Sequence, residues 1–124
     1  LFRSRAAAEL NQPPLLVSTD AHDGDLPPRL AGVEFHATEV VLDHLKKAED
    51  ADALILRLIE LGGAEAPVEL TLNPQLWGRV SGAEAVDLLE RPAGGEVTVD
   101  GNTIRAVVPP RGFRTLRVSL ERTE

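Results

Sequence analysis

The feature that most constrains the fold is a pair of short β-prone runs separated by a tight turn, at residues 97–108. Val97, Thr98 and Val99 are followed by Asp100-Gly101-Asn102 and then by a second run, residues 103–108. Asp-Gly and Gly-Asn pairs tolerate the positive φ that tight hairpin turns require, and β-branched residues favour strands. We therefore expect an antiparallel hairpin, and the rest of the chain has to supply a sheet that accepts it.

Two further segments alternate apolar and polar residues with the period of two that is typical of a half-buried strand. Their apolar positions are Val68, Leu70, Leu72, Leu116, Val118 and Leu120. Pro109-Pro110 and Gly112 separate the last of these strands from the hairpin. The C-terminal part of the chain is thus predicted to be a β-meander.

Residues 39–61 fit two secondary structures. They contain good helix formers and an apolar stripe at helical spacing. They equally fit two strands joined by a turn at residues 49–52, in which Leu54, Leu56 and Leu58 share one face and isoleucines occupy the other, as in a central strand covered on both sides. Because one sandwich absorbs all the strand signals, we predict an all-β antiparallel β-sandwich. An α+β fold with a helix in 39–61 is the alternative.

The N-terminal part has a different texture. Residues 2–10 are predicted to form a short helix that ends before Pro13-Pro14. Acidic and proline-rich sequence then follows, which is typical of a linker. We therefore predict a linker or edge segment over 1–32 and a C-terminal β-sandwich domain over 33–124.

Length and composition narrow the function classes. A chain of 124 residues builds at most one core. The chain has 13 basic and 20 acidic residues, so nucleic acid and anionic membranes are improbable partners. No apolar run reaches the roughly 20 residues of a membrane span. The absence of Cys excludes disulfides and thiolate metal sites, and the scarcity of aromatic residues argues against a self-standing carbohydrate-binding module. Because the chain lacks Met, we expect it to be a piece of a longer polypeptide.

Metal ligands are the first chemical candidates to weigh. The acidic loop at residues 20–25 holds three carboxylates and His22, a composition that a calcium site uses. It lacks the closing Glu of a helix–loop–helix site, so we favour a solvated loop. His22, His36 and His44 do not have the spacing of a zinc pair or a zinc finger. We predict no metal-binding and no cofactor-binding residue in this chain.

Catalytic patterns are also missing. No Gly-x-Ser-x-Gly elbow occurs, and Ser81-Gly82 is expected in a turn without a His partner. The pairs Gly62-Gly63 and Gly94-Gly95 lack the strand–loop–helix context that cradles a phosphate. With 20 acids present, sequence does not single out a glycosidic carboxylate pair. We predict no catalytic residue.

Two single residues are informative. Arg57 lies in the middle of an apolar run, where an uncompensated buried charge is costly. We expect it to extend its guanidinium to solvent, to pair with an acid such as Glu60 or Asp87, or to face another domain. Trp77 follows Asn73 in an expected loop, and we favour a core plug over a platform for a sugar ring.

One set of segments resembles a known family. Residues 40–50 run from an apolar strand into Lys-Lys-Ala-Glu-Asp, and residues 54–60 read Leu-Ile-Leu-Arg-Leu-Ile-Glu. Residues 86–90 contain Asp-Leu-Leu-Glu, and residues 104–116 end in Arg-Thr-Leu. In order and content these segments resemble the C-terminal β-domain of glycoside hydrolase family 38 α-mannosidases, with Ile in place of the usual aromatic before the Glu and with 86–90 as a strand.

The resemblance implies a β-sandwich behind a catalytic region that hydrolyses α-mannosidic linkages with retention. The family's zinc is expected in that catalytic domain, in a His-x-Asp type motif that nothing here matches, so no catalytic or zinc-binding residue is carried over. The implied partners are the catalytic and middle domains of the same polypeptide, and the carbohydrate substrate through them. A bacterial-type parent implies a cytoplasmic location.

Our prediction is therefore a non-catalytic C-terminal module that packs on the catalytic part, with a contribution to the substrate cleft left open. The alternative is an independent glycan- or protein-binding β-sandwich. Homo-oligomerisation and linkage preference also stay open at this stage.

Overall fold

The computed structural model describes residues 2–121 and separates the chain into two compact units, one within the first 30 residues and one from Ala31 onward. The first unit contains α1 (Phe2–Asn11), and residues 12–30 form no helix or strand. The helix predicted for 2–10 is confirmed, and it ends at the Pro13-Pro14 pair because proline cannot donate to the helical ladder. No helix among residues 2–121 is both long and apolar enough to cross a membrane.

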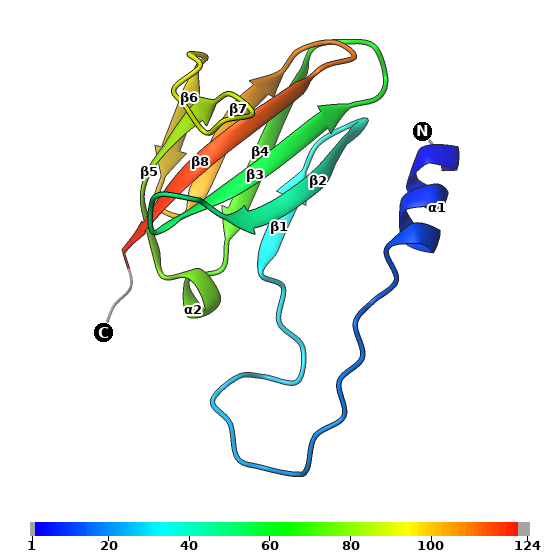
Figure 1. Ribbon diagram of the computed structural model, residues 1–124, viewed down its shortest axis with the longest axis vertical. Helices are drawn as coiled ribbons and strands as arrows, with labels where there is room; N and C mark the ends of the chain where they lie inside the picture. Colours follow the sequence, from blue (N-terminus) through cyan, green and yellow to red (C-terminus); the bar gives the residue numbers. More distant parts are fainter. Residues whose placement is uncertain (1, 122–124) are drawn as a thin grey trace. The chain divides into compact units, whose positions relative to one another are not determined.

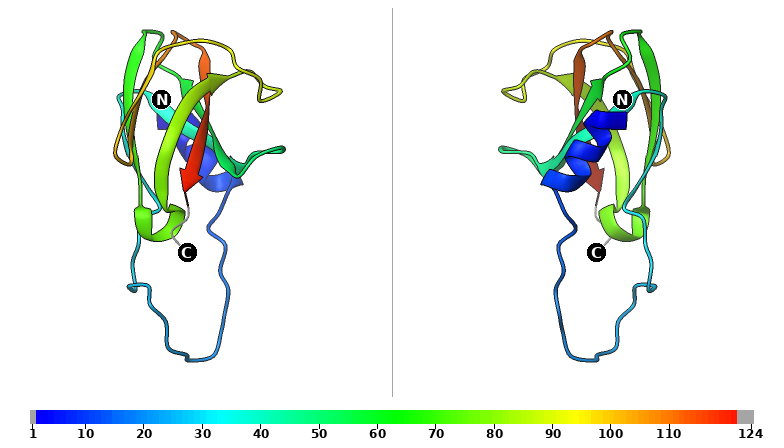
Figure 2. Two further views of the ribbon diagram at one scale, coloured as in Figure 1. Left: turned by 90° about the vertical axis from the view of Figure 1, so that its left-hand side faces the viewer. Right: turned by 90° about the vertical axis from the view of Figure 1, so that its right-hand side faces the viewer.

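The second unit is an antiparallel β-sandwich (Figure 1). Its elements are β1 (Val33–His36), β2 (Val40–Lys47), β3 (Ala53–Glu60), β4 (Ala66–Leu72), α2 (Pro74–Trp77), β5 (Arg79–Val86), β6 (Val97–Asp100), β7 (Thr103–Val108) and β8 (Phe113–Glu121). Sheet I has the strand order β1-β4-β7-β6, and sheet II has the order β2-β3-β8-β5. Figure 2 shows the two sheets edge-on as two layers. The predicted all-β antiparallel sandwich is confirmed.

Residues 39–61 form the two strands β2 and β3, so the helical alternative is wrong. β3 is a central strand that pairs with β2 on one side and with β8 on the other. Its Leu56 lies opposite Leu45 and Leu116, and these pairings override the helical stripe because both neighbours offer complete ladders to β3. The turn at residues 48–53 is closed by a hydrogen bond from the Ala48 N–H to the Ala53 carbonyl, at 2.8 Å.

The core lies between the sheets and is aliphatic. Alternate residues of each strand point inward, as the period of two predicts. The fully buried side chains of this inner core are Val40, Leu56, Leu58, Leu70, Leu72, Ile104, Val108, Leu116 and Val118. Burial of each such side chain stabilises the fold by about 2 kcal/mol, so the second unit holds a complete core of its own.

The end of β5 corrects two sequence-based expectations. Ser81-Gly82 lies inside β5, where a register shift between Val80 and Gly82 marks an irregularity in pairing with β8, and not in a turn. Residues 87–90, expected as a strand, form a turn instead. The turn forms because the Asp87 Oδ1 accepts hydrogen bonds from the N–H groups of Leu89 and Arg91, at 2.8 and 3.0 Å, which pulls the backbone out of the ladder.

The β6–β7 hairpin forms where the sequence predicts it, with Gly101 at φ 58° in its turn. Asn102 has a further role. Its side-chain amide donates to the carbonyls of Leu72 and Gly78, at 3.0 and 2.8 Å, and its Oδ1 accepts from the Val80 N–H at 3.1 Å. The hairpin turn is thereby fixed to the segment that carries the chain from sheet I to sheet II.

Candidate functional site

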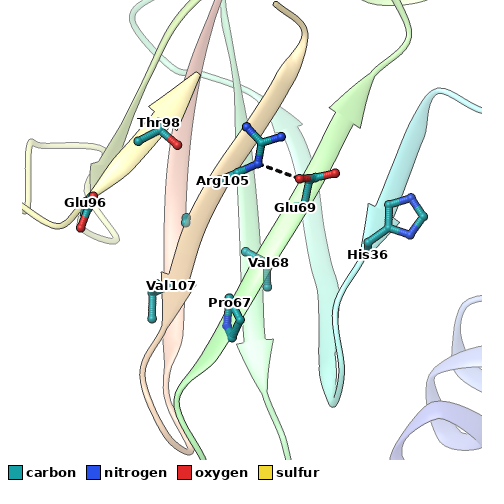
Figure 3. A pocket seen from close by; sticks show the side chains of 9 residues that line it. His36, Pro67, Val68, Glu69, Glu96, Thr98, Arg105 and Val107 are labelled. Atoms are coloured by element: carbon teal, nitrogen blue, oxygen red, sulfur yellow. Dashed lines mark hydrogen bonds and ion pairs between the residues drawn. The ribbon is translucent and has the colours of Figure 1, made fainter. Parts of the chain in front are cut away.

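A shallow pocket of about 340 Å³ lies on the outer face of sheet I (Figure 3). Strands β4 and β7 form its floor, and β1 and β6 border it. Its lining residues are His36, Pro67, Val68, Glu69, Glu96, Thr98, Arg105, Ala106 and Val107. Figure 3 shows Glu69 and Arg105 pointing toward each other at its centre.

The pocket is a consequence of strand register. His36 lies opposite Glu69, Glu69 opposite Arg105, and Arg105 opposite Thr98. Directly opposed residues in an antiparallel sheet project from the same face. These four residues, one from each strand of sheet I, therefore form one row across the sheet, called the polar row below.

The charges of the polar row are balanced locally. The Arg105 Nε donates to the Glu69 Oε2 at 2.7 Å, and the Arg105 Nη1 lies 4.0 Å from the Asp100 Oδ2. The guanidinium also carries donors that Glu69 does not use, and the carboxylate of Glu96 faces the same pocket. Donors and acceptors side by side above the apolar Pro67 suit a ligand rich in hydroxyl groups.

Glu60 is the most deeply buried acid of the sandwich, with 3% of its surface exposed. Its carboxylate accepts hydrogen bonds from the N–H of Arg111 at 2.7 Å and from the N–H groups of Gly62 and Gly63 at 2.5 to 2.9 Å. The Arg111 N–H lowers the pKa of the Glu60 carboxyl most, against the opposing effect of burial, and the two glycine amides add to it. The carboxylate therefore joins the β3–β4 connection to the β7–β8 turn.

A second pocket, of about 250 Å³, borders the same carboxylate and also exposes Glu39 and Glu65. The oxygens of Glu60 are already engaged by backbone amides. Across the described residues 2–121, no three His, Asp or Glu side chains gather into a group that fits a metal ion. This acidic pocket therefore does not fit zinc, whose sites use three or four converging ligands.

The turn at residues 87–91, called the strap below, crosses the outer face of sheet II. The Glu90 Oε1 lies 2.8 Å from the Lys46 Nζ, and the Glu90 Oε2 accepts from the Glu49 N–H at 2.9 Å. The contact with the Lys46 ammonium is the largest cause of a lowered pKa at Glu90, and the same contact raises the pKa of Lys46. Arg117 holds the Glu90 carbonyl at 3.1 Å.

The strap covers a second, smaller apolar cluster on the outer side of sheet II. Its buried members are Ala48, Ala53, Ile55 and Val86. Figure 2 shows the β5–β6 connection and the β2–β3 turn projecting on the same side of the sandwich. Sheet II is thus buried on both sides at one end, as the leucine and isoleucine faces of β3 predict.

The residues singled out in the sequence are dispersed. The loop at 20–25 lies in the first unit with exposed side chains, and the His22 Nδ1 is 3.0 Å from the carbonyl of Asp23. His36 is exposed at the pocket on sheet I. His44 is exposed on β2 and contacts the carboxylate of Asp43.

The sequence-based expectations for Arg57 and Trp77 have different outcomes. Arg57 is half-buried and donates from Nε to the Thr115 Oγ1 at 3.4 Å, and no carboxylate lies within ion-pair distance of it among residues 2–121. The expected pairs with Glu60 and Asp87 are wrong. Trp77 ends the short helix α2 and packs against the core, with its Nε1 donating to the Gly32 carbonyl at 2.8 Å, so its interpretation as a core plug is confirmed.

Sequence reasoning missed the polar row and the role of Glu60. The alternation of residues 67–72 already turns Glu69 outward, but the register that places Arg105 beside it is a property of the folded sheet. A signal for Glu60 was present, because an acid at the end of an apolar strand followed by Gly62-Gly63 offers an acceptor next to two unhindered amides.

Two antiparallel four-stranded sheets, packed face to face around an aliphatic core, define this protein as a β-sandwich domain. The model of the family "Glycosyl hydrolases family 38 C-terminal beta sandwich domain" matches residues 39–124, which include β2 to β8. The chain belongs to this family, and the resemblance seen in the sequence is confirmed. No curated protein matches the chain.

Proposed function

We propose that the chain is the non-catalytic C-terminal β-sandwich of an α-mannosidase-like glycosyl hydrolase. In this proposal the enzyme cleaves α-mannosidic linkages with retention, and the sandwich packs on the catalytic part and helps to shape the substrate cleft. The family match over residues 39–124 is the observation that carries the proposal. The complete core of the second unit supports it, since an appended domain must fold around its own apolar side chains.

The proposal assigns the remaining parts of the chemistry to other domains. In this proposal zinc is held in the catalytic domain of the same enzyme, which is what the family resemblance implies. The partners are the catalytic and middle domains of one polypeptide, and carbohydrate is met through them. A cytoplasmic location is part of the same proposal and rests on the resemblance alone.

The test compares three samples: the whole enzyme, the enzyme without residues 31–124, and the purified chain. We expect an aryl α-mannoside to be hydrolysed by the whole enzyme with an α-configured first product. The enzyme lacking residues 31–124 should melt at a lower temperature, and the purified chain should show no turnover and no stoichiometric zinc. Turnover by the chain alone, or a truncated enzyme of unchanged stability and kinetics, would contradict the proposal.

A second candidate, an independent glycan-binding module, is favoured by one observation. The pocket on sheet I combines the donors of Arg105 and the acceptors of Glu69 and Glu96 with an apolar floor, which suits a sugar. Titration of the chain with mannose oligosaccharides decides between the two. Saturable binding in the micromolar range that disappears in Arg105→Ala favours the binding module, and lack of saturation favours the appended domain.

A further inference from the structure

The outer face of sheet II also carries an apolar row, at the end of β3 that lies away from the β2–β3 turn. Val41 lies opposite Ile59, and Ile59 lies opposite Phe113, so these three side chains form a row across β2, β3 and β8. Phe113 is 48% exposed, and Val41 and Ile59 are half-buried. The outer face of sheet I carries the polar row instead. Exposed apolar side chains that lie together mark a surface that a partner covers.

Arg57 adds a charge to this apolar surface. In register it lies between His44 and Thr115, next to the apolar row, and its one side-chain hydrogen bond among the described residues is that to Thr115. Its terminal amino groups carry donors that Thr115 does not use. A half-buried guanidinium without a carboxylate is an unfavourable arrangement that a partner acid would relieve.

The strap carries two further exposed leucines on the same outer side of sheet II. Leu88 and Leu89 are 58% and 70% exposed. Their backbone is fixed, because the Asp87 carboxylate binds the N–H groups of Leu89 and Arg91, and Glu90 anchors the strap to β2. Leucines held out on a rigid turn lose little conformational entropy when a partner covers them.

We propose that this surface is where the sandwich packs on the preceding part of the same enzyme. The docking face consists of Val41, Arg57, Ile59, Leu88, Leu89 and Phe113. Its partner surface is apolar and supplies a carboxylate to Arg57. This inference rests on the proposed function and deepens it, because it says which of the two outer faces the sandwich uses.

The choice of occupant follows from the family. A C-terminal domain is tethered to the domains before it, so a matching surface there is met at high effective concentration. A second copy would bring two docking faces together about a two-fold axis, with Arg57 near its own counterpart. Glu84, Asp87 and Glu90 on this face are already paired with Arg117, Arg91 and Lys46. Asp43, next to the register partner of Arg57, pairs only with His44 among the described residues, so tethering and not charge decides against a second copy.

Hydroxyl-radical footprinting of the whole enzyme and of the isolated chain tests the docking face directly. We expect Phe113, Leu88 and Leu89 to be labelled in the chain and protected in the enzyme. His36, exposed at the pocket of sheet I, is the internal control and should be labelled equally in both. Protection of His36 with unchanged labelling of Phe113 would overturn the docking face while leaving the appended domain intact.

The remaining outcomes separate the two proposals. If neither face is protected in the whole enzyme, the packing role itself fails, and the docking face fails with it. If the isolated chain forms a dimer by sedimentation velocity and Phe113 is protected in that dimer, a second copy is the occupant and the inference is wrong.

A matched pair of variants supplies an independent measurement. Phe113→Glu in the whole enzyme should lower its melting temperature. It should also shift the equilibrium between the docked and the undocked sandwich by about 30-fold or more toward the undocked state, as loss of a central apolar contact does. Thr98→Glu, an equal change at an exposed position of sheet I, should leave both unchanged. Circular dichroism of the isolated Phe113→Glu chain checks that the sandwich still folds. A stable Phe113→Glu enzyme with wild-type docking would overturn the inference.

Discussion

The outer faces of the two sheets differ although their strands share the same alternating pattern. Sheet I is open, and its outward side chains form the polar row. On sheet II the strap covers Ile55 and Val86, and the apolar row lies beyond it. The difference comes from the connections: β6 and β7 are joined by a tight turn, whereas the chain between Val86 and Val97 is long enough to fold back over its sheet. Alternation thus decides which residues point outward, and the connections decide which of them are buried.

The largest effect is expected at the outward face of β3. Ile55 is 1% exposed beneath the strap, so Ile55→Ala should lower the free energy of unfolding by about 3 kcal/mol. Thr98→Ala on the open face of sheet I is the matched control and should change it by less than about 0.5 kcal/mol. Urea denaturation of the isolated chain measures both. Equal effects at the two positions would remove the contrast between the faces.

The next largest effect is expected at Glu60, whose carboxylate joins the β3–β4 connection to the β7–β8 turn. Glu60→Gln should lower the melting temperature by about 5 °C at neutral pH, because an amide nitrogen then faces backbone N–H groups that need an acceptor. Thermal melts measure this. Glu69→Gln, which alters an exposed acid, is the control and should melt close to the wild type.

The same carboxylate predicts a pH dependence with a definite sign. The pKa of Glu60 is lowered in the folded chain, so its contribution to stability is complete above its unfolded value near 4.5 and is lost as the pH falls through the lower folded value. The wild type should therefore lose stability in acid faster than Glu60→Gln does. Parallel stability curves for the two proteins between pH 3 and pH 7 would contradict this assignment.

Much of the sandwich was predictable because its signals are local. The hairpin at Gly101, the inward leucines of β3 and the turn at 49–52 each depend on residues next to one another in the sequence. The helical reading of 39–61 was excluded only by pairing on both sides of β3, which is a nonlocal property. Residues 87–90 were wrongly expected as a strand for a different, local reason: the Asp87 side chain accepts hydrogen bonds from Leu89 and Arg91 and ends the strand, which the resemblance did not indicate.

The candidate site was less predictable than the fold. The outward direction of Glu69 and Arg105 follows from alternation, but a shift of one residue in the β4–β7 register would turn Arg105 inward. Asn102 was recognised as a turn residue, while its bonds to Leu72 and Gly78 depend on where α2 lies. Side-chain partners that lie 24 to 36 residues apart leave no local trace in a single sequence.

The smallest effect is expected for the ion pair at the centre of the polar row. The Glu69 and Arg105 side chains are 42% and 49% exposed, so water competes with their hydrogen bond and salt screens their attraction. A double-mutant cycle with Glu69→Gln and Arg105→Met should give a coupling energy of about 0.5 kcal/mol or less, and 1 M salt should reduce it further. A coupling energy above about 1.5 kcal/mol that is insensitive to salt would mean that the pair is desolvated. The outer face of sheet I would then be covered as that of sheet II is, and the contrast between the two faces would fail.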